Sequence, residues 1–114
     1  MLPLKNRLKK EKDFKLVFKR GKSFREDDLL LRLVENNLKT VRFGFVVGLK
    51  VSKKANLRNK LKRRLREIIR KKLPVLKTGF DVILITDKGL INKSFQEMEA
   101  LTNSLLKKAK ICGN

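Results

Sequence analysis

Residues 53–73 read KKANLRNKLKRRLREIIRKKL, and the spacing of their apolar residues predicts one long amphipathic helix. At about 100° per residue, one side of this helix collects Leu57, Leu61, Leu65, Ile68 and Ile69. An adjacent side, called the basic face below, carries Arg58, Asn59, Lys62, Arg63, Arg66 and Arg70. The sequence therefore predicts a helix that buries an apolar stripe and presents a dense set of cations beside it.

The like charges on the basic face repel one another, and nothing else in the predicted helix is expected to offset them. A polyanion would offset them, and nucleic-acid phosphate is the commonest polyanion that a small protein meets. The alternative is an ordinary solvated helix face with no ligand. The adjacent pair Arg58 and Asn59 favours specific contacts, because a planar guanidinium fork and an amide offer directed hydrogen bonds.

The charge excess extends over the whole chain of 114 residues, which has 31 Lys and Arg against 11 Asp and Glu and a formal net charge of +20. That imbalance points to nucleic acid first and to an anionic membrane second. The length suits one domain, and a hydrophobic share of 41% predicts that it folds. The single cysteine, Cys112, cannot form an internal disulfide, so we expect a cytoplasmic protein. No apolar run approaches the roughly 20 residues of a membrane span, and the N-terminal sequence does not resemble a signal peptide.

Catalytic side chains are not evident in the sequence. Histidine is absent, so the usual general base and any histidine-rich metal site are missing. The acidic residues form one cluster, Glu26-Asp27-Asp28, at an expected turn. We interpret this cluster as a solvated loop, with a weak cation site as the alternative. We therefore expect no catalytic group and no tightly bound metal in this chain.

The remaining patterns predict an α+β domain. The expected elements are a basic arm without regular structure over 1–8, a helix over 10–20, strands over 22–24, 29–35 and 40–47, the central helix, a strand over 80–86 and a last helix beginning at Ser94. Gly21 should end the first helix, and Ser52 is the expected N-cap of the central one. Ser94 and Glu97 form a capping box. The strand over 80–86 is apolar on both faces, so it should lie inside the sheet.

Two strands and the first helix hold further candidates for ligand contacts. Arg32 and Arg42 lie on the second face of their strands, which is either an ordinary exposed sheet face or a surface that a ligand approaches closely at Gly44. Phe14 and Phe18 share one face of the first helix. The helical pattern favours both rings in the core, whereas a functional alternative places them in a groove, stacked on unpaired bases.

Four pieces of the chain together resemble the protein subunit of bacterial ribonuclease P. They are Arg7-Leu8 with Asp13-Phe14, Val17-Phe18 and Gly21; Gly44-Phe45-Val46-Val47 before a Lys-rich loop; Arg58-Asn59-Lys60-Leu61-Lys62-Arg63-Arg64-Leu65-Arg66-Glu67; and Asp81 opening an apolar strand. The third piece is the most specific, because it looks like the family's Arg-Asn-Arg helix motif with its basic continuation. In this order and spacing the four pieces span about residues 7–106, nearly the whole chain.

The resemblance implies a single-domain, two-layer α/β sandwich of order α-β-β-β-α-β-α, similar to the second domain of the fifth small-subunit ribosomal protein. It also implies a left-handed β-α-β crossover, against the usual right-handed rule. The protein would be a monomeric subunit of an endoribonuclease ribonucleoprotein that removes the 5′ leader of precursor tRNA. The partner RNA would carry the catalytic groups and would bind Mg²⁺ at its own phosphates.

The resemblance also implies two sets of site residues. Those for the catalytic RNA are Lys50, Lys53, Arg58, Asn59, Lys60, Lys62, Arg63 and Arg66. Those for a cleft that holds the single-stranded leader, between the first helix and the open sheet face, are Phe14, Phe18, Arg32 and Arg42.

Some positions depart from the family's pattern. Lys60 stands where the motif has arginine, which keeps the charge but loses the bidentate fork. Arg32 stands in place of a strand aromatic, and Asp87 stands where a basic residue is frequent. The family's Ser-Lys-Lys stretch fits in two registers, which leaves Lys50 and Lys53 as alternative counterparts.

Rival functions share parts of this pattern. A ribosomal or other structural RNA-binding protein would have the same charge and size but no role in cleavage. A membrane-surface protein could also use a basic amphipathic helix, although the strand patterns favour a packed domain. A stand-alone metal nuclease is disfavoured by the missing histidine.

Overall fold

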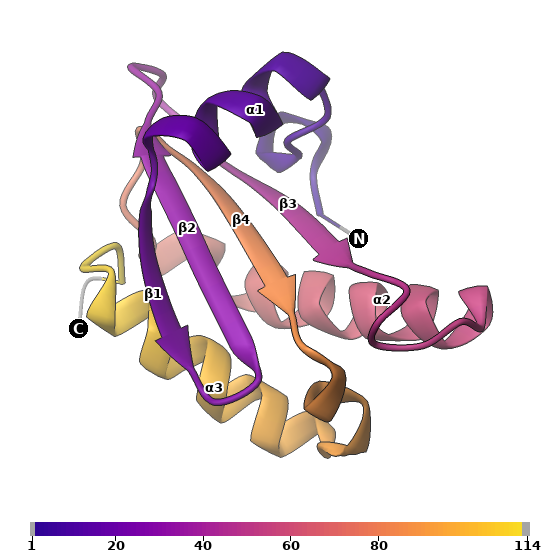
Figure 1. Ribbon diagram of the computed structural model, residues 1–114. Helices are drawn as coiled ribbons and strands as arrows, with labels where there is room; N and C mark the ends of the chain where they lie inside the picture. Colours follow the sequence, from indigo (N-terminus) through magenta and orange to yellow (C-terminus); the bar gives the residue numbers. More distant parts are fainter. Residues whose placement is uncertain (1, 113–114) are drawn as a thin grey trace.

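Helices cover both faces of a four-stranded sheet in the computed structural model, which describes residues 2–112 (Figure 1). The main elements are α1 (Glu11–Arg20), β1 (Lys22–Glu26), β2 (Leu29–Glu35), β3 (Val41–Val47), α2 (Ala55–Lys72), β4 (Phe80–Thr86) and α3 (Phe95–Lys108). Short 3-10 helices are η1 (Leu4–Asn6), η2 (Leu73–Val75) and η3 (Lys88–Asn92). Met1 and residues 113–114, the ends of the expected domain, lie outside the described residues.

The strand order in the sheet is β1-β2-β4-β3. β4 pairs with β2 antiparallel and with β3 parallel, and β1 forms the outer edge beside β2. Val82, Ile83 and Leu84 of β4 are fully buried, because helices cover both faces of the sheet at this strand. The prediction of a central strand over 80–86 is confirmed.

The parallel strands β3 and β4 are joined through α2 by a left-handed crossover. In Figure 1 both strands point downward, β3 lies to the right of β4, and α2 passes behind the sheet. Nearly all β-α-β connections are right-handed, so the general rule would have predicted the opposite handedness for this crossover. The crossover implied by the family resemblance is the one observed.

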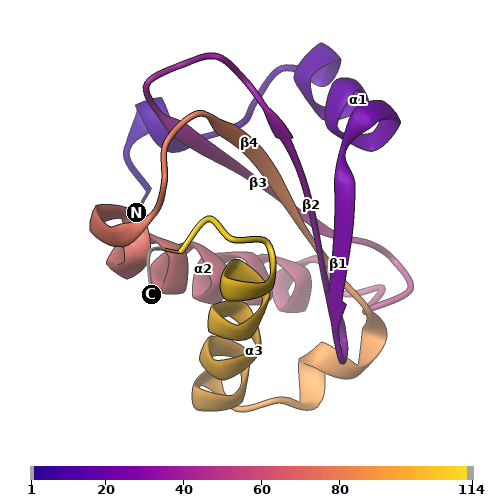
Figure 2. The same cartoon turned by 90° about the vertical axis from the view of Figure 1, so that its left-hand side faces the viewer.

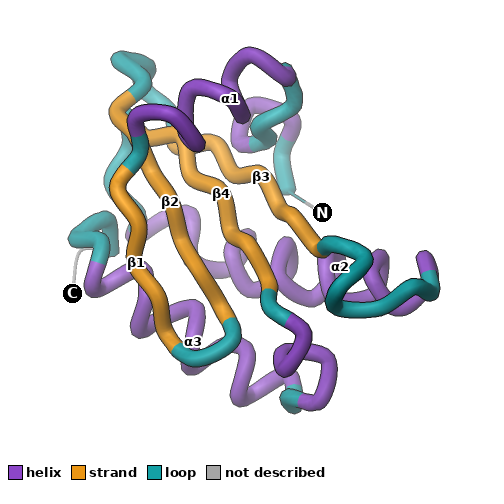
Figure 3. The backbone as a smooth tube through the Cα atoms, viewed as in Figure 1, coloured by secondary structure: helices purple, strands orange, loops and turns teal. Residues whose placement is uncertain are grey.

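α2 and α3 cover one face of the sheet, and α1 crosses the other (Figures 2 and 3). Leu29, Leu31 and Leu33 of β2 point into the core beneath α2 and α3, as their alternation predicted. On the other face, Val17 of α1 packs on Ile83 in a smaller cluster. Burial of each large apolar side chain contributes about 1.5–3 kcal/mol, so the larger cluster dominates stability.

α1 lies over the end of the sheet where β3 and β4 begin, and within the described chain no helix covers the other end of that face (Figure 3). A partly open sheet face therefore borders α1. The described helices also include none that is both long and apolar enough to cross a membrane.

The N-terminal segment differs from the expected arm. Residues Leu4–Asn6 form η1, and the side chains of Leu2 and Leu8 are buried. Asn6 Nδ2 donates a hydrogen bond to the Val41 carbonyl at 2.8 Å, which ties the segment to β3. The expectation of no regular structure over 1–8 is wrong because the two leucines find partners that are distant in sequence.

Two helix ends also differ in detail from the predictions. α2 begins after Lys54, and Ser52 is not its N-cap: the Ser52 Oγ accepts a hydrogen bond from the Lys54 N–H at 3.1 Å, within a turn. Gly21 ends α1, but with an extended backbone. Glycine is needed there because a Cβ would lie 2.4 Å from the Val17 carbonyl oxygen. The capping box of Ser94 and Glu97 at the start of α3 is confirmed.

Candidate RNA interface

α2 separates an apolar side from a basic one, as its sequence predicted. Leu61, Leu65, Ile68 and Ile69 are buried beneath the sheet, and Leu57 is half-buried near the start of the helix. The residues assigned to the catalytic RNA all remain accessible. Lys50, Lys53, Asn59, Lys60 and Arg63 are exposed, and Arg58, Lys62 and Arg66 are half-buried. The basic face is therefore open to a polyanion while the adjacent apolar side anchors the helix.

Arg70 is the member of the basic face whose charge is offset within the helix. Its Nε donates a hydrogen bond to Oε2 of Glu67 at 3.0 Å, one turn earlier. The hydrogen bond from Arg70 lowers the pKa of the Glu67 carboxyl below its ordinary value. The expectation that nothing in the helix offsets these charges is thus wrong at this end, and the other cations of the basic face lie between Arg58 and Arg66.

Arg58 joins the start of α2 to the preceding loop. Its guanidinium donates a hydrogen bond to the Ser52 carbonyl at 2.8 Å. The same loop carries Lys50 and Lys53, which are exposed. Arg58 therefore both presents charge and holds the lysine loop against the helix.

Arg66 connects the basic face to the region beside α1. Its guanidinium carbon lies 5.9 Å from the centroid of the Phe45 ring, a cation–π distance. Arg66 also lines a hollow of about 250 Å³ together with Phe14, Gly44 and Lys9. One end of the cationic surface thus meets an aromatic-lined hollow at the edge of α1.

The two phenylalanines of α1 have different environments. Val17 is fully buried and anchors the helix on Ile83. Phe14 is half-buried with its ring against Gly44, whereas 45% of Phe18 is exposed. The helical pattern favoured both rings in the core; Phe18 is not a core residue, and Phe14 is both packed and accessible from the hollow.

Arg32 fixes the C-terminal end of α1 to β2. Its Nε and one terminal nitrogen donate hydrogen bonds to the carbonyls of Val17 (3.2 Å) and Phe18 (2.7 Å). The other terminal nitrogen donates to the Ser23 Oγ at 2.6 Å. The sequence placed Arg32 on the α1 side of the sheet but could not show these partners, because they lie on other elements.

Arg42 makes a bidentate ion pair with Asp81, whose carboxylate is buried (2.8 and 2.7 Å). Asn36 Nδ2 donates to the same carboxylate at 2.8 Å, and Asp13 of α1 lies 3.5 Å from the Arg42 guanidinium. The hydrogen bond to Asp81 raises the pKa of Arg42. The network ties the start of α1 to the sheet. In the sequence, Asp81 was visible as the single carboxylate near the start of the apolar strand β4, but we predicted no role for it in the site.

The acidic cluster at the β1–β2 turn is paired with lysines. Lys93 lies 3.2 Å from the Asp27 carboxylate and 3.9 Å from that of Asp28, and Lys108 pairs with Glu26. Over the described part of the chain, no group of three or more His, Cys, Asp or Glu side chains could hold a metal ion.

Comparison with known proteins gives a consistent family. Residues 2–110 match the family model described as Ribonuclease P. A ribonuclease P protein component from Pseudanabaena sp. is 37% identical over 112 residues, 97% of each chain. Another, from Synechocystis sp., is 45% identical over 85 residues, 74% of this chain and 68% of the relative.

Solved structures agree with the sequence relatives. The RNase P protein from Thermotoga maritima, in complex with 1-(4-fluorophenyl)-2-thiourea, matches with a TM-score of 0.82 and 38% identity over 89% of this chain and 97% of that one. A Staphylococcus aureus RNase P protein mutant with defective mRNA degradation activity matches with a TM-score of 0.88 and 27% identity, over 94% of this chain and 90% of that one. With its fold, its basic helix and these matches, the chain belongs to the ribonuclease P protein family.

Proposed function

We propose that this chain is the RNA-binding subunit of ribonuclease P and that it acts at two adjoining surfaces. The basic face of α2, with Lys60 and with Lys50 and Lys53 of the loop before it, binds the catalytic RNA. The cleft between α1 and the open sheet face binds the single-stranded 5′ leader of precursor tRNA. The subunit works as a monomer in the cytoplasm and promotes removal of the leader.

The observation that carries this proposal is the position of Arg66. It belongs to the basic face of α2, and it lines the same hollow as Phe14 of α1. An RNA bound along α2 and a strand entering beneath α1 would therefore meet at this residue. Phosphate contacts along the helix supply affinity and position, while the accessible rings offer stacking surfaces for unpaired bases.

Within this proposal Arg32 and Arg42 shape the leader cleft. Both side chains hold α1 in place through hydrogen bonds or ion pairs, and both lie on the face of the sheet that α1 crosses. The half-exposed Phe18 sits at the end of α1 that Arg32 fixes. These two arginines would therefore set the distance between α1 and the sheet in the cleft that the leader enters.

The chemistry of cleavage is assigned to the RNA partner. We propose that Mg²⁺ is bound by RNA phosphates and that this chain contributes no catalytic side chain. Carboxylates of the acidic cluster at the β1–β2 turn are paired with lysines, which leaves them poor cation ligands.

The test is cleavage of a precursor tRNA by the cognate catalytic RNA with and without this protein. We expect the protein to increase cleavage and to bind precursor tRNA in the assembled complex more tightly than mature tRNA. A protein that binds the catalytic RNA without changing cleavage or this preference would be a structural RNA-binding protein, and the proposal would be wrong. Cleavage by the RNA-free protein would contradict the assignment of the chemistry to RNA.

A further inference from the structure

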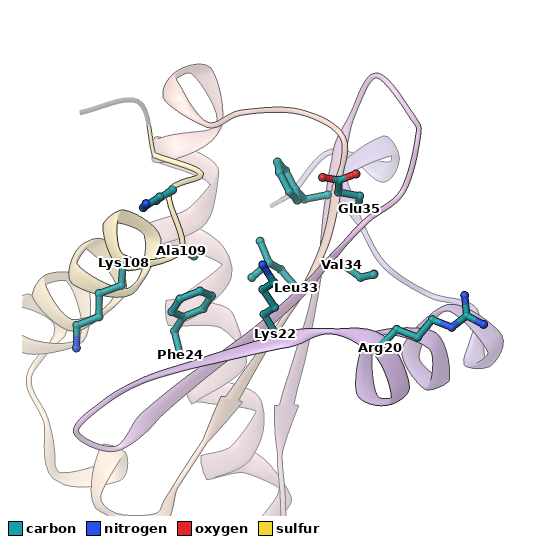
Figure 4. A pocket seen from close by; sticks show the side chains of 10 residues that line it. Arg20, Lys22, Phe24, Leu33, Val34, Glu35, Lys108 and Ala109 are labelled. Atoms are coloured by element: carbon teal, nitrogen blue, oxygen red, sulfur yellow. The ribbon is translucent and has the colours of Figure 1, made fainter.

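A second, larger hollow lies at the outer edge of the sheet, between β1 and the C-terminal end of α3 (Figure 4). Its volume is about 590 Å³, inside the range of about 300–1,000 Å³ that is usual for small-molecule sites. None of the residues that line it belongs to the basic face or to the leader cleft. We call it the β1-edge pocket, and its walls and rim differ sharply in chemistry.

The walls of the β1-edge pocket are apolar and partly aromatic. They include Phe24 of β1, Leu33 of β2, Phe80 of β4 and Ala109 at the end of α3. Phe24 and Phe80 pack against the main core with one side and are only half-buried, so each ring keeps accessible surface. Every nucleobase has a flat face that can stack on such rings.

The rim is cationic and poorly neutralised. Lys22 and Lys110 are exposed and, among the described residues, have no ion-pair partner, and Arg20 at the end of α1 is a third such cation. Lys108 also lines the pocket, but it pairs with Glu26. Glu35 is the carboxylate among the lining residues, so the cations outnumber it and the pocket favours an anion.

β1 adds backbone groups to this chemistry. Among the described strands it pairs with β2 alone, so it is an edge of the sheet whose outer N–H and C=O groups have no partner strand. The Arg25 carbonyl already accepts a hydrogen bond from Lys108 Nζ at 3.2 Å, so the other outer groups of β1 are the ones that remain for a ligand. Such groups can bond the edge of a base that lies against the rings. A flat apolar group, a polar edge and an adjoining negative charge together describe a nucleotide.

We propose that the β1-edge pocket binds one unpaired nucleotide of an RNA strand. The base lies against Phe24 and Phe80, and the phosphate lies at Lys22 and Lys110. This site goes beyond the basic face and the leader cleft and gives the subunit a third RNA-binding surface, at the far edge of the sheet.

The test is an NMR titration of the ¹⁵N-labelled full chain with adenosine 5′-monophosphate. We expect saturable shifts at the backbone amides of Phe24, Leu33 and Ala109. Adenosine alone and inorganic phosphate alone should each bind more weakly, because each satisfies only the walls or only the rim. Lys22→Gln combined with Lys110→Gln should weaken nucleotide binding by about tenfold or more. Glu35→Gln is the matched control on the same pocket and should not weaken it.

Other outcomes would overturn the proposal. They are an absence of saturable shifts at the pocket amides, equal shifts with phosphate alone, and equal binding by the double variant and the unaltered chain. Lys22 and Lys110 are exposed, and dispersed amide resonances would show that the double variant is folded. The titration contains neither catalytic RNA nor precursor tRNA, so its failure would leave the proposed function in tRNA processing standing.

Discussion

The ring of Phe14 lies directly against Gly44. A Cβ on Gly44 would come 2.5 Å from Cζ and 2.7 Å from Cε1 of this ring, far inside the contact distance of carbon atoms. The missing side chain at position 44 therefore allows Phe14 to rest on β3, and with Phe14 it sets the height of α1 above the sheet. Phe14 and Gly44 both line the hollow beside Arg66.

Gly44→Ala should displace the Phe14 ring and disturb the cleft. We expect a loss of about 1–3 kcal/mol in unfolding free energy from the forced contact, and a reduced preference of the assembled complex for precursor over mature tRNA. Thermal unfolding and the two tRNA affinities would measure these effects. Gly48→Ala is the control, because a Cβ there meets no atom within 4 Å. An unchanged preference in Gly44→Ala would show that the ring position does not matter for the leader.

The basic face of α2 provides a prediction about salt dependence. Arg58→Ala with Lys62→Ala should weaken assembly with the catalytic RNA and flatten the slope of log K against log salt by somewhat under two units. Both side chains are off the apolar stripe, so the core should persist, while Arg58→Ala also removes the hydrogen bond to the Ser52 carbonyl that holds the lysine loop. Lys77→Ala with Lys107→Ala removes two exposed cations elsewhere and serves as the charge-matched control. Equal slopes for the two double variants would mean that charge alone, and not this face, governs binding.

Local sequence patterns predicted most of the fold because the elements that they describe are stabilised by neighbours in the chain or by burial on both sides. The strand over 80–86 is continuous in apolar residues, and the box of Ser94 and Glu97 closes on itself across one helical turn. The N-terminal segment was missed for the opposite reason. Its order depends on Asn6 reaching Val41, a partner 35 residues away.

The pair of Arg42 and Asp81 should be essential for stability. Arg42→Met leaves the buried Asp81 carboxylate with Asn36 but without its cation, which should cost up to about 3–5 kcal/mol in unfolding free energy. For a domain of this size the melting temperature would fall by more than about ten degrees. Arg42→Met combined with Asp81→Leu should recover part of that loss, because no unpaired charge then remains. A stable Arg42→Met protein with weakened leader binding would instead identify Arg42 as a direct leader contact.

The capping box gives a prediction about pH. The hydrogen bond from the Ser94 backbone N–H is the main cause that lowers the pKa of the Glu97 carboxyl below its ordinary value of 4.5. A lowered folded-state pKa means that this contribution to stability is complete above pH 4.5 and is lost as the pH falls through the folded-state pKa. Glu97→Gln should therefore show a smaller fall in melting temperature across this range than Glu99→Gln on the same helix. Identical pH profiles for the two variants would contradict the prediction.

The candidate site was predictable from sequence only in part. Periodicity identified the basic face, since its members share one helix. It could not distinguish Phe14 from Phe18, because both lie on the side of α1 that Val17 anchors, and the exposure of each depends on what the sheet presents beneath it. The partners of Arg32 on α1 lie 14 and 15 residues away, and its partner on β1, Ser23, lies nine residues away, beyond the reach of any local pattern.

Phe18 offers the sharpest test of the leader cleft. The side chain is 45% exposed, so Phe18→Ala removes less buried surface than a core substitution and should lower the melting temperature less. If a leader base stacks on the ring, the variant should lose about 1–3 kcal/mol of precursor binding, roughly a 5- to 150-fold weaker affinity. Mature tRNA has no leader, and its affinity should hardly change.

Leu16→Ala is the matched control for Phe18→Ala, because Leu16 lies on the same helix and is 40% exposed. Its loss removes exposed apolar surface without removing a ring, so it should leave the ratio of precursor to mature affinity unchanged. Equal effects of the two variants on this ratio would mean that α1 contributes general apolar contact and that no base stacks on Phe18. A large fall in melting temperature for Phe18→Ala with an unchanged ratio would show that the ring supports the fold in solution and that the leader binds elsewhere.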